Sequence, residues 1–163
     1  MTLDAPTDAA PYRVTFFFGP EPTDDRCTAQ HCVFNVKKRS WKAGIQVTVD
    51  MAGESVRIKA WKVEGGRIQL YLLDTNCEGN SPEAAAITNR LYGGDKEHRL
   101  RQEMVLGIGG VRVLRALGLD PQVFHTNEGH AGFLALERLR ELVATGLTFR
   151  EAIEAVRAGG VFT

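Results

Sequence analysis

The chain has 163 residues, of which 44% are hydrophobic and 25% charged, a composition typical of a single soluble globular domain. Its 20 basic and 20 acidic residues cancel, so charge gives no support for binding nucleic acid or an anionic membrane. No apolar run approaches the roughly 18 residues that span a bilayer, and the N-terminus lacks the features of a secretory signal.

The three cysteines favour a reducing, cytoplasmic setting over a disulfide scaffold, because their number is odd and their spacing irregular. Cys27, His31 and Cys32 lie close enough in sequence to suggest zinc. A structural zinc site needs four ligands, however, and no second pair follows at a suitable distance. We therefore expect no metal in this chain.

The first half of the chain predicts short strands after a small, polar tail at residues 1–11. Alternation of apolar and polar residues, with glycine and proline between the runs, is typical of a meander of strands. The predicted strands are Tyr12–Phe18, His31–Val36, Ile45–Val49, Val56–Val63 and Arg67–Leu73.

The second half predicts helices separated by short strands. Ser81 and Pro82 are typical of an N-cap and a first helical residue, in a helix that we expect to end near Leu91. Asp95 is placed to cap a longer helix that ends at Gly118. Further helices are predicted over 133–145 and from a Thr148 capping box to residue 158, with strands at 122–125 and 161–163.

The sequence predicts two features of this long helix. Its apolar residues recur every three or four positions and predict one buried stripe, made of Leu100, Met104, Ile108, Val111, Leu114 and Leu117. Gly107, Gly109 and Gly110 each cost a helix roughly 1 kcal/mol relative to alanine. We therefore expect another backbone, or a ligand, to approach the helix closely at these glycines.

The order of elements over 67–163 predicts a mixed α/β fold, in which a β-meander precedes half of a parallel α/β sheet. The last residues have the pattern of a strand that is beginning. Because parallel sheets are covered on both faces, we expect the chain to be a piece of a larger protein. The alternative is an edge strand or a frayed tail.

The most informative segment is His125–His130, which contains two imidazoles, a carboxylate, an amide and a hydroxyl in one strand-to-helix turn. Ligands of open α/β sheets usually bind at such turns, at the carboxyl ends of strands. Side chains of this kind, together with the amides at the start of a helix, suit a hydroxyl-rich ligand or a phosphate.

Three alternatives for this segment remain open. His125, Glu128 and His130 are possible metal ligands, although their spacing differs from that of helical zinc sites. His and Glu also qualify for general acid–base work, but no nucleophile accompanies them. Finally, Asn127 or Glu128 can serve simply to cap the following helix, with the two histidines having no role in a site.

Two charged segments are better explained as solvated surface. Glu97 and Arg101 are spaced for an ion pair on the long helix. The basic run 37–39 beside Trp41 is most simply a hairpin turn, although contact with nucleic acid or glycan is an alternative.

Several motifs, in the same order, resemble the α-glucan (glycogen, starch and maltodextrin) phosphorylases of bacteria. The resemblance is dense from about Val56 to Thr163 and is absent from Tyr12 to Lys42. The matching segments are Leu70–Asn76, Thr88–Asp95, Glu97–Glu103, Gly107–Gly110 and His125–Ala131.

The resemblance implies a fragment of a two-domain, GT-B-like glycosyltransferase fold, with residues 12–55 of uncertain origin and 56–163 belonging to the N-terminal catalytic domain. Members of the family cleave α-1,4-glucans with phosphate and release glucose 1-phosphate, with pyridoxal phosphate as cofactor. By position, the substrate-binding residues would be Thr126, Asn127, Glu128 and His130, and Gly94 and Asp95 would belong to a loop that gates the sugar site.

The departures from the family limit this function. The upstream glycine loop and the whole cofactor-binding domain are absent from the sequence, so we expect neither pyridoxal phosphate binding nor phosphorylase activity from this chain alone. The alternatives are a non-catalytic glycan-binding or assembly module and, less favoured, a small enzyme that uses His125, Glu128 and His130. An open sheet edge predicts a homo-oligomer.

Overall fold

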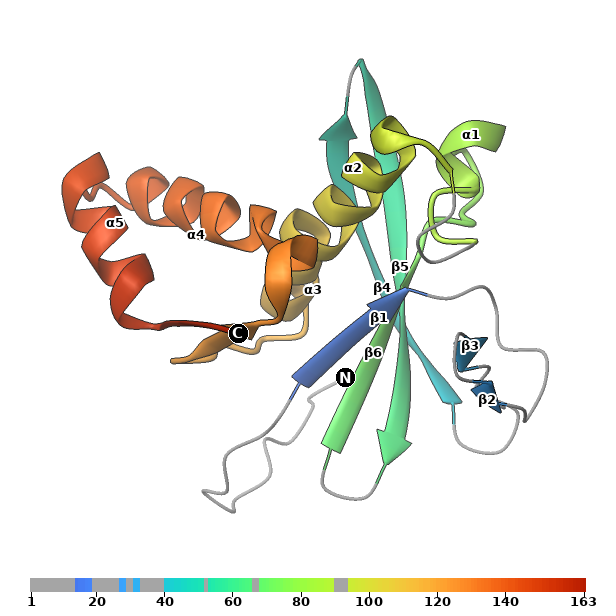
Figure 1. Cartoon of the computed structure of the whole chain (residues 1–163), viewed down its shortest axis with the longest axis horizontal. Coiled ribbons are helices and arrows are strands. Elements are labelled where there is room, and N and C mark those ends of the chain that lie inside the picture. The colour runs from blue at the N-terminus through green and yellow to red at the C-terminus, as the bar shows by residue number, and fades with distance from the viewer. Residues whose placement is uncertain are drawn as a thin grey trace.

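The computed structural model describes two small sheets and one four-stranded sheet that packs against a long helix (Figure 1). The description covers residues 14–18, 27–28, 31–32, 40–51, 53–65, 68–89 and 94–163. The predicted tail at 1–11 and the basic run 37–39 lie outside these residues, as do the last four residues of the predicted strand His31–Val36.

The four-stranded sheet has the order β1-β6-β5-β4. Strands β4, β5 and β6 form an antiparallel meander, as the alternation predicted, and β1 pairs with β6 in parallel. Cys27–Thr28 and His31–Cys32 form a separate antiparallel pair, β2 and β3. The bounds of the large sheet are β1 Val14–Phe18, β4 Ser40–Met51, β5 Glu54–Gly65 and β6 Ile68–Asp74.

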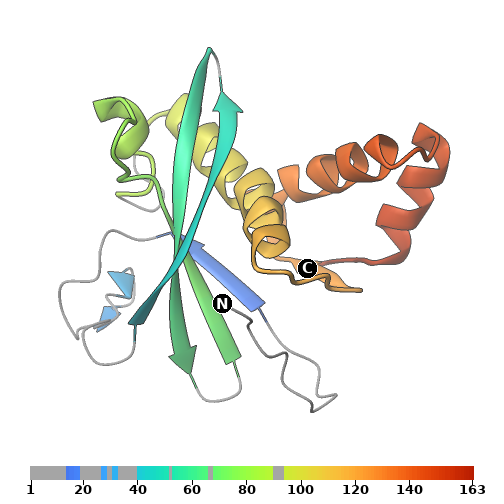
Figure 2. The ribbon, with the colours of Figure 1, turned by 180° about the vertical axis from the view of Figure 1, so that it is seen from behind.

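One face of this sheet carries the core. Val49, Ile58 and Leu73 are at most 1% exposed and pack with Val105 and Val113 of the long helix. Figure 2, seen from behind, shows the opposite face of the sheet, which none of the described helices crosses. The sheet and the long helix thus make a two-layer unit held together by apolar packing.

The long helix consists of α2 (Lys96–Met104), the π-helical segment η2 (Val105–Gly109) and α3 (Gly110–Ala116). Asp95 caps it, as predicted. The predicted stripe is wrong at Leu100, which is 47% exposed, whereas Val105 and Val113 are buried. A π turn holds more residues than an α turn, so the faces before and after η2 do not share one helical period.

The helix predicted to run from Pro82 to Leu91 is shorter in the structure. Ser81 caps it as expected, but α1 covers only Pro82–Ala85. The side chain of Gln102 donates a hydrogen bond of 2.8 Å to the Ile87 carbonyl, which a continuing helix would need. The buried Thr88 hydroxyl meanwhile accepts a bond of 3.0 Å from the Thr75 amide, so the chain turns here.

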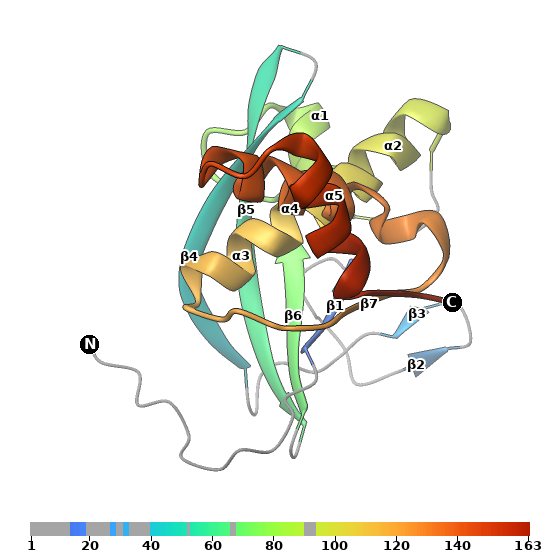
Figure 3. The same cartoon turned by 90° about the vertical axis from the view of Figure 1, so that its left-hand side faces the viewer.

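The C-terminal region, residues 119–163, contains β7 (Phe124–Thr126), η3 (Glu128–Ala131), α4 (Phe133–Ala144), α5 (Phe149–Ala158) and β8 (Gly160–Phe162). The Thr148–Glu151 capping box forms as predicted. Figure 3 looks onto this region and shows α4 and α5 side by side, with β7 below them in that view.

The expectation of one half parallel sheet is only partly right. β7 and β8 do pair in parallel, but they form a sheet of their own. The strand predicted at 67–73 lies instead in the large sheet, where its neighbours are β5 and β1. The place of β6 is determined by its hairpin pairing with β5, the strand just before it in sequence. The order of helices and strands after β6, from which the half sheet was predicted, contains no information about that pairing.

Candidate functional site

The predicted ligand loop leaves the carboxyl end of β7 and continues through η3 into α4. β7 and β8 run side by side, with Thr126 opposite Phe162, so the loop begins where both strands end. Asn127 and Glu128 are exposed, and Thr126 and His130 are partly exposed. All four predicted residues of this loop are therefore at least partly accessible to solvent.

Glu128 and His130 form the central pair of the loop. Oε2 of Glu128 lies 3.1 Å from Nε2 of His130. Glu128 has φ of +51°, in the left-handed region that side chains other than glycine rarely adopt. Such a backbone costs about 1–3 kcal/mol and persists only where the surroundings impose it. In this conformation the largely exposed Glu128 carboxylate lies within hydrogen-bond distance of the His130 imidazole.

Thr163 holds the start of the loop through its backbone. The Glu128 amide donates a hydrogen bond of 2.7 Å to the Thr163 carbonyl, and the Thr163 amide donates one of 3.1 Å to the Thr126 carbonyl. The Thr163 hydroxyl also lies 2.9 Å from Nε2 of His125. These contacts extend the β7–β8 ladder by one step and hold the backbone on both sides of Asn127.

The contacts bear on two of the alternatives for this loop. Asn127 is the N-cap residue of η3, but its side chain makes no capping hydrogen bond, and Gly132 precedes α4 without a side-chain cap. His125 faces Thr163 and is not paired with Glu128. Among the described residues, no three His, Cys, Asp or Glu side chains come close enough to hold a metal ion.

Gly94 and Asp95 lie at the start of α2. The Asp95 carboxylate accepts a hydrogen bond of 2.9 Å from the His98 amide and caps the helix. Gly94 has φ of +85° and lies directly against the His98 side chain. The hydrogen bonds and ion pairs between described residues join neither residue to the 126–130 loop, so their role in gating a sugar site stays a prediction.

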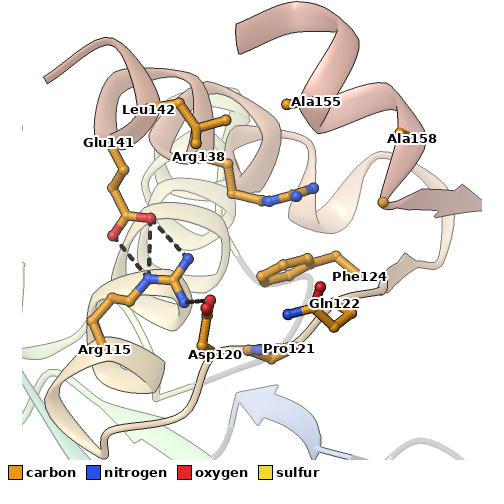
Figure 4. Close-up of a pocket in the computed structure, with 11 residues that line it drawn as sticks. Arg115, Asp120, Pro121, Gln122, Phe124, Arg138, Glu141, Leu142, Ala155 and Ala158 are labelled. Atoms are coloured by element: carbon orange, nitrogen blue, oxygen red, sulfur yellow. Dashed lines mark hydrogen bonds and ion pairs between the residues drawn. The ribbon is translucent and has the colours of Figure 1, made fainter. Parts of the chain in front are cut away.

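A pocket of about 420 Å³ opens at the other end of β7, between α3, α4 and α5 (Figure 4). One arginine in its wall binds two acidic side chains. Arg115 contacts Glu141 at 3.1 Å and Asp120 at 2.5 Å. Burial alone would lower the pKa of Arg115, but the hydrogen bonds and charges of Glu141 and Asp120 raise it.

Arg138 joins three elements in the wall of the same pocket. Its guanidinium lies 4.1 Å from the centre of the Phe124 ring and donates a hydrogen bond of 3.2 Å to the Val156 carbonyl of α5. Burial, and then the nearby charge of Arg115, lower the pKa of Arg138. Arg138, which lies on α4, is therefore a joint that links this helix to α5 and to β7.

Two buried carboxylates were not anticipated from the sequence. Asp74 ends β6 and binds Lys59 and the Trp61 indole, each at 3.0 Å. Glu137 is held by Arg112 and Arg140, each at 2.8 Å. Position 137 lies three residues after Leu134, on the inner face of α4. A charged residue at such a position, among apolar residues, was the feature of the sequence from which a buried carboxylate could have been predicted.

Two of the described lysines, Lys59 and Lys96, do not fit a pyridoxal phosphate site. The cofactor requires a lysine amine that is free to form a Schiff base within a pocket. Lys59 is already bound to Asp74 and to the Asn76 carbonyl, and Lys96 is exposed at the first position of α2. No lysine lines the pocket beside Arg138.

Comparison with known proteins gives close relatives for most of the chain, although no family model matches it. A glycogen phosphorylase of Mycobacterium tuberculosis is 49% identical over 114 residues, which is 66% of this chain and 13% of that protein. A glycogen phosphorylase of Aquifex aeolicus is 44% identical over 130 residues, 78% of this chain and 19% of the relative.

A maltodextrin phosphorylase of Thermococcus litoralis is 43% identical over 117 residues, 72% of this chain and 14% of the relative. The chain therefore spans only about 13–19% of the length of these curated relatives. The resemblance to α-glucan phosphorylases is confirmed for a partial segment. Separately, no helix in the described part of the chain is long and apolar enough to cross a membrane.

Proposed function

We propose that residues 126–130 form part of an α-1,4-glucan site. The proposal starts from the match of this chain to a partial segment of the α-glucan phosphorylases. We further propose that the described elements are a piece of a two-domain, GT-B-like glycosyltransferase fold. The observation that carries the proposal is the accessible Glu128–His130 pair, with Asn127 beside it, at the carboxyl end of β7.

The chemistry of the loop supports a neutral, hydroxyl-rich ligand. The Asn127 amide both donates and accepts, the Glu128 carboxylate accepts, and the Thr126 hydroxyl does both. A carboxylate that fixes an imidazole leaves that ring oriented for a hydrogen bond with a sugar hydroxyl. The Asn127 side chain does not cap η3; its Oδ1 accepts a hydrogen bond of 3.5 Å from the Thr163 hydroxyl, and its NH2 group can donate to a ligand.

We also propose that this chain alone neither binds pyridoxal phosphate nor releases glucose 1-phosphate. The bonded state of Lys59 and the surface position of Lys96 support this proposal. The chain is incubated with the cofactor, and cofactor absorbance and glucose 1-phosphate release from maltoheptaose are measured after gel filtration. Retained absorbance together with release above a blank would contradict the proposal.

The glucan site is tested by titration with maltoheptaose and with glucose 1-phosphate, followed through backbone amide shifts. Shifts should gather at residues 126–130 and disappear in Asn127→Ala. Gln122→Ala is the matched control, because Gln122 is also an exposed amide but lies at the opposite end of β7. Unchanged shifts at 126–130 in a folded protein would overturn the site.

An assembly module is the second candidate, and the β7–β8 sheet favours it. Among the described residues this sheet has two strands, and no third strand pairs with either; Val161 and Phe162 are 46% and 72% exposed. Exposed strand edges pair readily with another chain, so we propose a homo-oligomer formed through β8. Light scattering during gel filtration should show a dimer or larger species that Phe162→Asp dissociates. A monomer at all concentrations would exclude this assembly.

A further inference from the structure

The first turn of α4, which follows the 126–130 loop, rests on a glycine of the long helix. Gly107 is buried in η2 and lies against the first turn of α4. A β-carbon on residue 107 would lie 2.6 Å from the Leu134 backbone nitrogen and 2.8 Å from the Phe133 carbonyl carbon. Atoms at such distances overlap, so a side chain here would displace the backbone of α4.

Gly109, two residues later in the same π segment, is different. A β-carbon there would meet the Cδ1 atom of Ile58 at 2.7 Å, and its next neighbour, in Val49, would lie at 3.8 Å. The end of an isoleucine side chain can rotate away, whereas a helix backbone cannot. The two glycines therefore face different partners: Gly107 faces the α4 backbone and Gly109 faces the sheet.

The contact at Gly107 is transmitted to the loop over a short, bonded path. The Ala135 amide donates to the Gly132 carbonyl, and the Gly132 amide donates to the Gly129 carbonyl at 3.0 Å. η3 itself packs on α2 and on η2. Upstream, Glu128 is bonded to Thr163 at 2.7 Å. The loop is thus held at both ends, and the left-handed Glu128 is itself the upstream attachment.

We propose that Gly107 is a positioning residue for the Asn127–His130 loop: the close approach of α4 that it permits holds Glu128 in its left-handed conformation and against His130. The importance of this geometry for glucan binding rests on the function proposed above. The mechanical part, that Gly107 controls the conformation of Glu128, is independent of any ligand.

The first experiment compares Gly107→Ala with Gly109→Ala by amide hydrogen exchange in the full chain. Gly107→Ala should speed exchange of the Glu128 amide at least about tenfold, because its bond to Thr163 opens more often, and should leave the Val56 amide of the core sheet unchanged. Gly109→Ala should leave the Glu128 amide as in the parent. Equal acceleration in both variants, or none in Gly107→Ala, overturns the proposal.

The second experiment measures the strain itself. Glu128→Gly should raise the melting temperature of the parent, because glycine adopts positive φ without strain. In the Gly107→Ala background, Glu128→Gly should raise the melting temperature by clearly less than it does in the parent, because the loop has already relaxed. Equal increments in the two backgrounds contradict the coupling. Trimethylamine N-oxide, which favours the folded state, is added to every sample so that a weakened variant is still compared folded.

Maltoheptaose titration of the same variants separates the two levels of the proposal. If Gly107→Ala weakens binding and Gly109→Ala does not, both the glucan site and its positioning are supported. If the parent protein binds no maltoheptaose, the proposed function fails, while the exchange and melting data still decide whether Gly107 positions Glu128. Unchanged binding in Gly107→Ala, with a parent that binds, overturns the positioning role.

Discussion

The four-stranded sheet and the C-terminal region are stabilised in different ways. Ile58, Leu73 and Val105 are completely buried between the sheet and the long helix, whereas Val161 and Phe162 of the small sheet are exposed. The C-terminal region instead depends on a few specific contacts, such as the Arg138–Phe124 stack and the Glu137 ion pairs. Substitutions in the two regions should therefore differ in size and in their dependence on pH.

The largest effect should come from the apolar core. Ile58→Ala removes a fully buried side chain that packs against Gly109, and we expect a loss of about 2–5 kcal/mol in the free energy of unfolding. Leu136→Ala on α4, where the side chain is 57% exposed, should cost little. Urea denaturation measures both variants. Similar losses in the two would remove the contrast between the regions.

Glu137→Gln should have the next largest effect. Burial alone would raise the pKa of Glu137, but hydrogen bonds from Arg140 and Arg112 hold it below its usual value of 4.5. The substitution leaves two arginines without their carboxylate and should cost about 1–3 kcal/mol near neutral pH.

The sign of the pH dependence follows from the lowered pKa. The stabilisation from Glu137 is complete above the unfolded-state pKa and is lost as pH falls through the folded-state value. The difference between the parent and Glu137→Gln should therefore shrink below about pH 4.5. Urea denaturation across pH 3–7 tests this, with the exposed Glu154→Gln as control. A constant difference would show that the charge of Glu137 does not matter.

Arg138→Met tests the joint at the pocket. Methionine keeps the aliphatic stem but loses the stack on Phe124 and the hydrogen bond to Val156, and we expect a cost of about 1–2 kcal/mol. Arg157→Met is the control, because Arg157 and its partner Glu154 are both largely exposed. Thermal unfolding distinguishes them, and equal melting temperatures for both variants would count against the joint.

The smallest effect should come from the cap of α5. Thr148→Ala removes the hydroxyl that accepts a hydrogen bond from the Glu151 amide and should cost about 1 kcal/mol, whereas Thr148→Ser should retain most of the stability. Circular dichroism during heating measures both. If the serine variant were as unstable as the alanine variant, loss of the capping hydrogen bond would not explain the loss of stability.

Features that depend on nearby residues could be predicted from the sequence. The caps at Ser81, Asp95 and Thr148 each need only a side chain and an amide three residues later, so their patterns predicted them correctly. The β4–β6 meander likewise follows from alternation between close turns. The close backbone approach expected at the glycines of the long helix is confirmed at Gly107.

Features that depend on distant partners could not be predicted in this way. The end of α1 is decided by Gln102, fifteen residues after the carbonyl that it binds. The position of the candidate loop was predicted, but its conformation depends on Thr163 and on Gly107, which lie far from it in sequence. Thr126, Asn127, Glu128 and His130 are at least partly exposed, while the relation of Gly94 and Asp95 to them is still a prediction.

The π-helical segment has a consequence for sequence alignment. Because each of its hydrogen bonds spans one residue more than in an α-helix, the segment amounts to a single-residue insertion in the long helix. A homologue with a regular helix here would align with a one-residue gap between Val105 and Gly109. Such a gap would record a rotation of α3 relative to α2, and Gly107 would then no longer lie against Leu134.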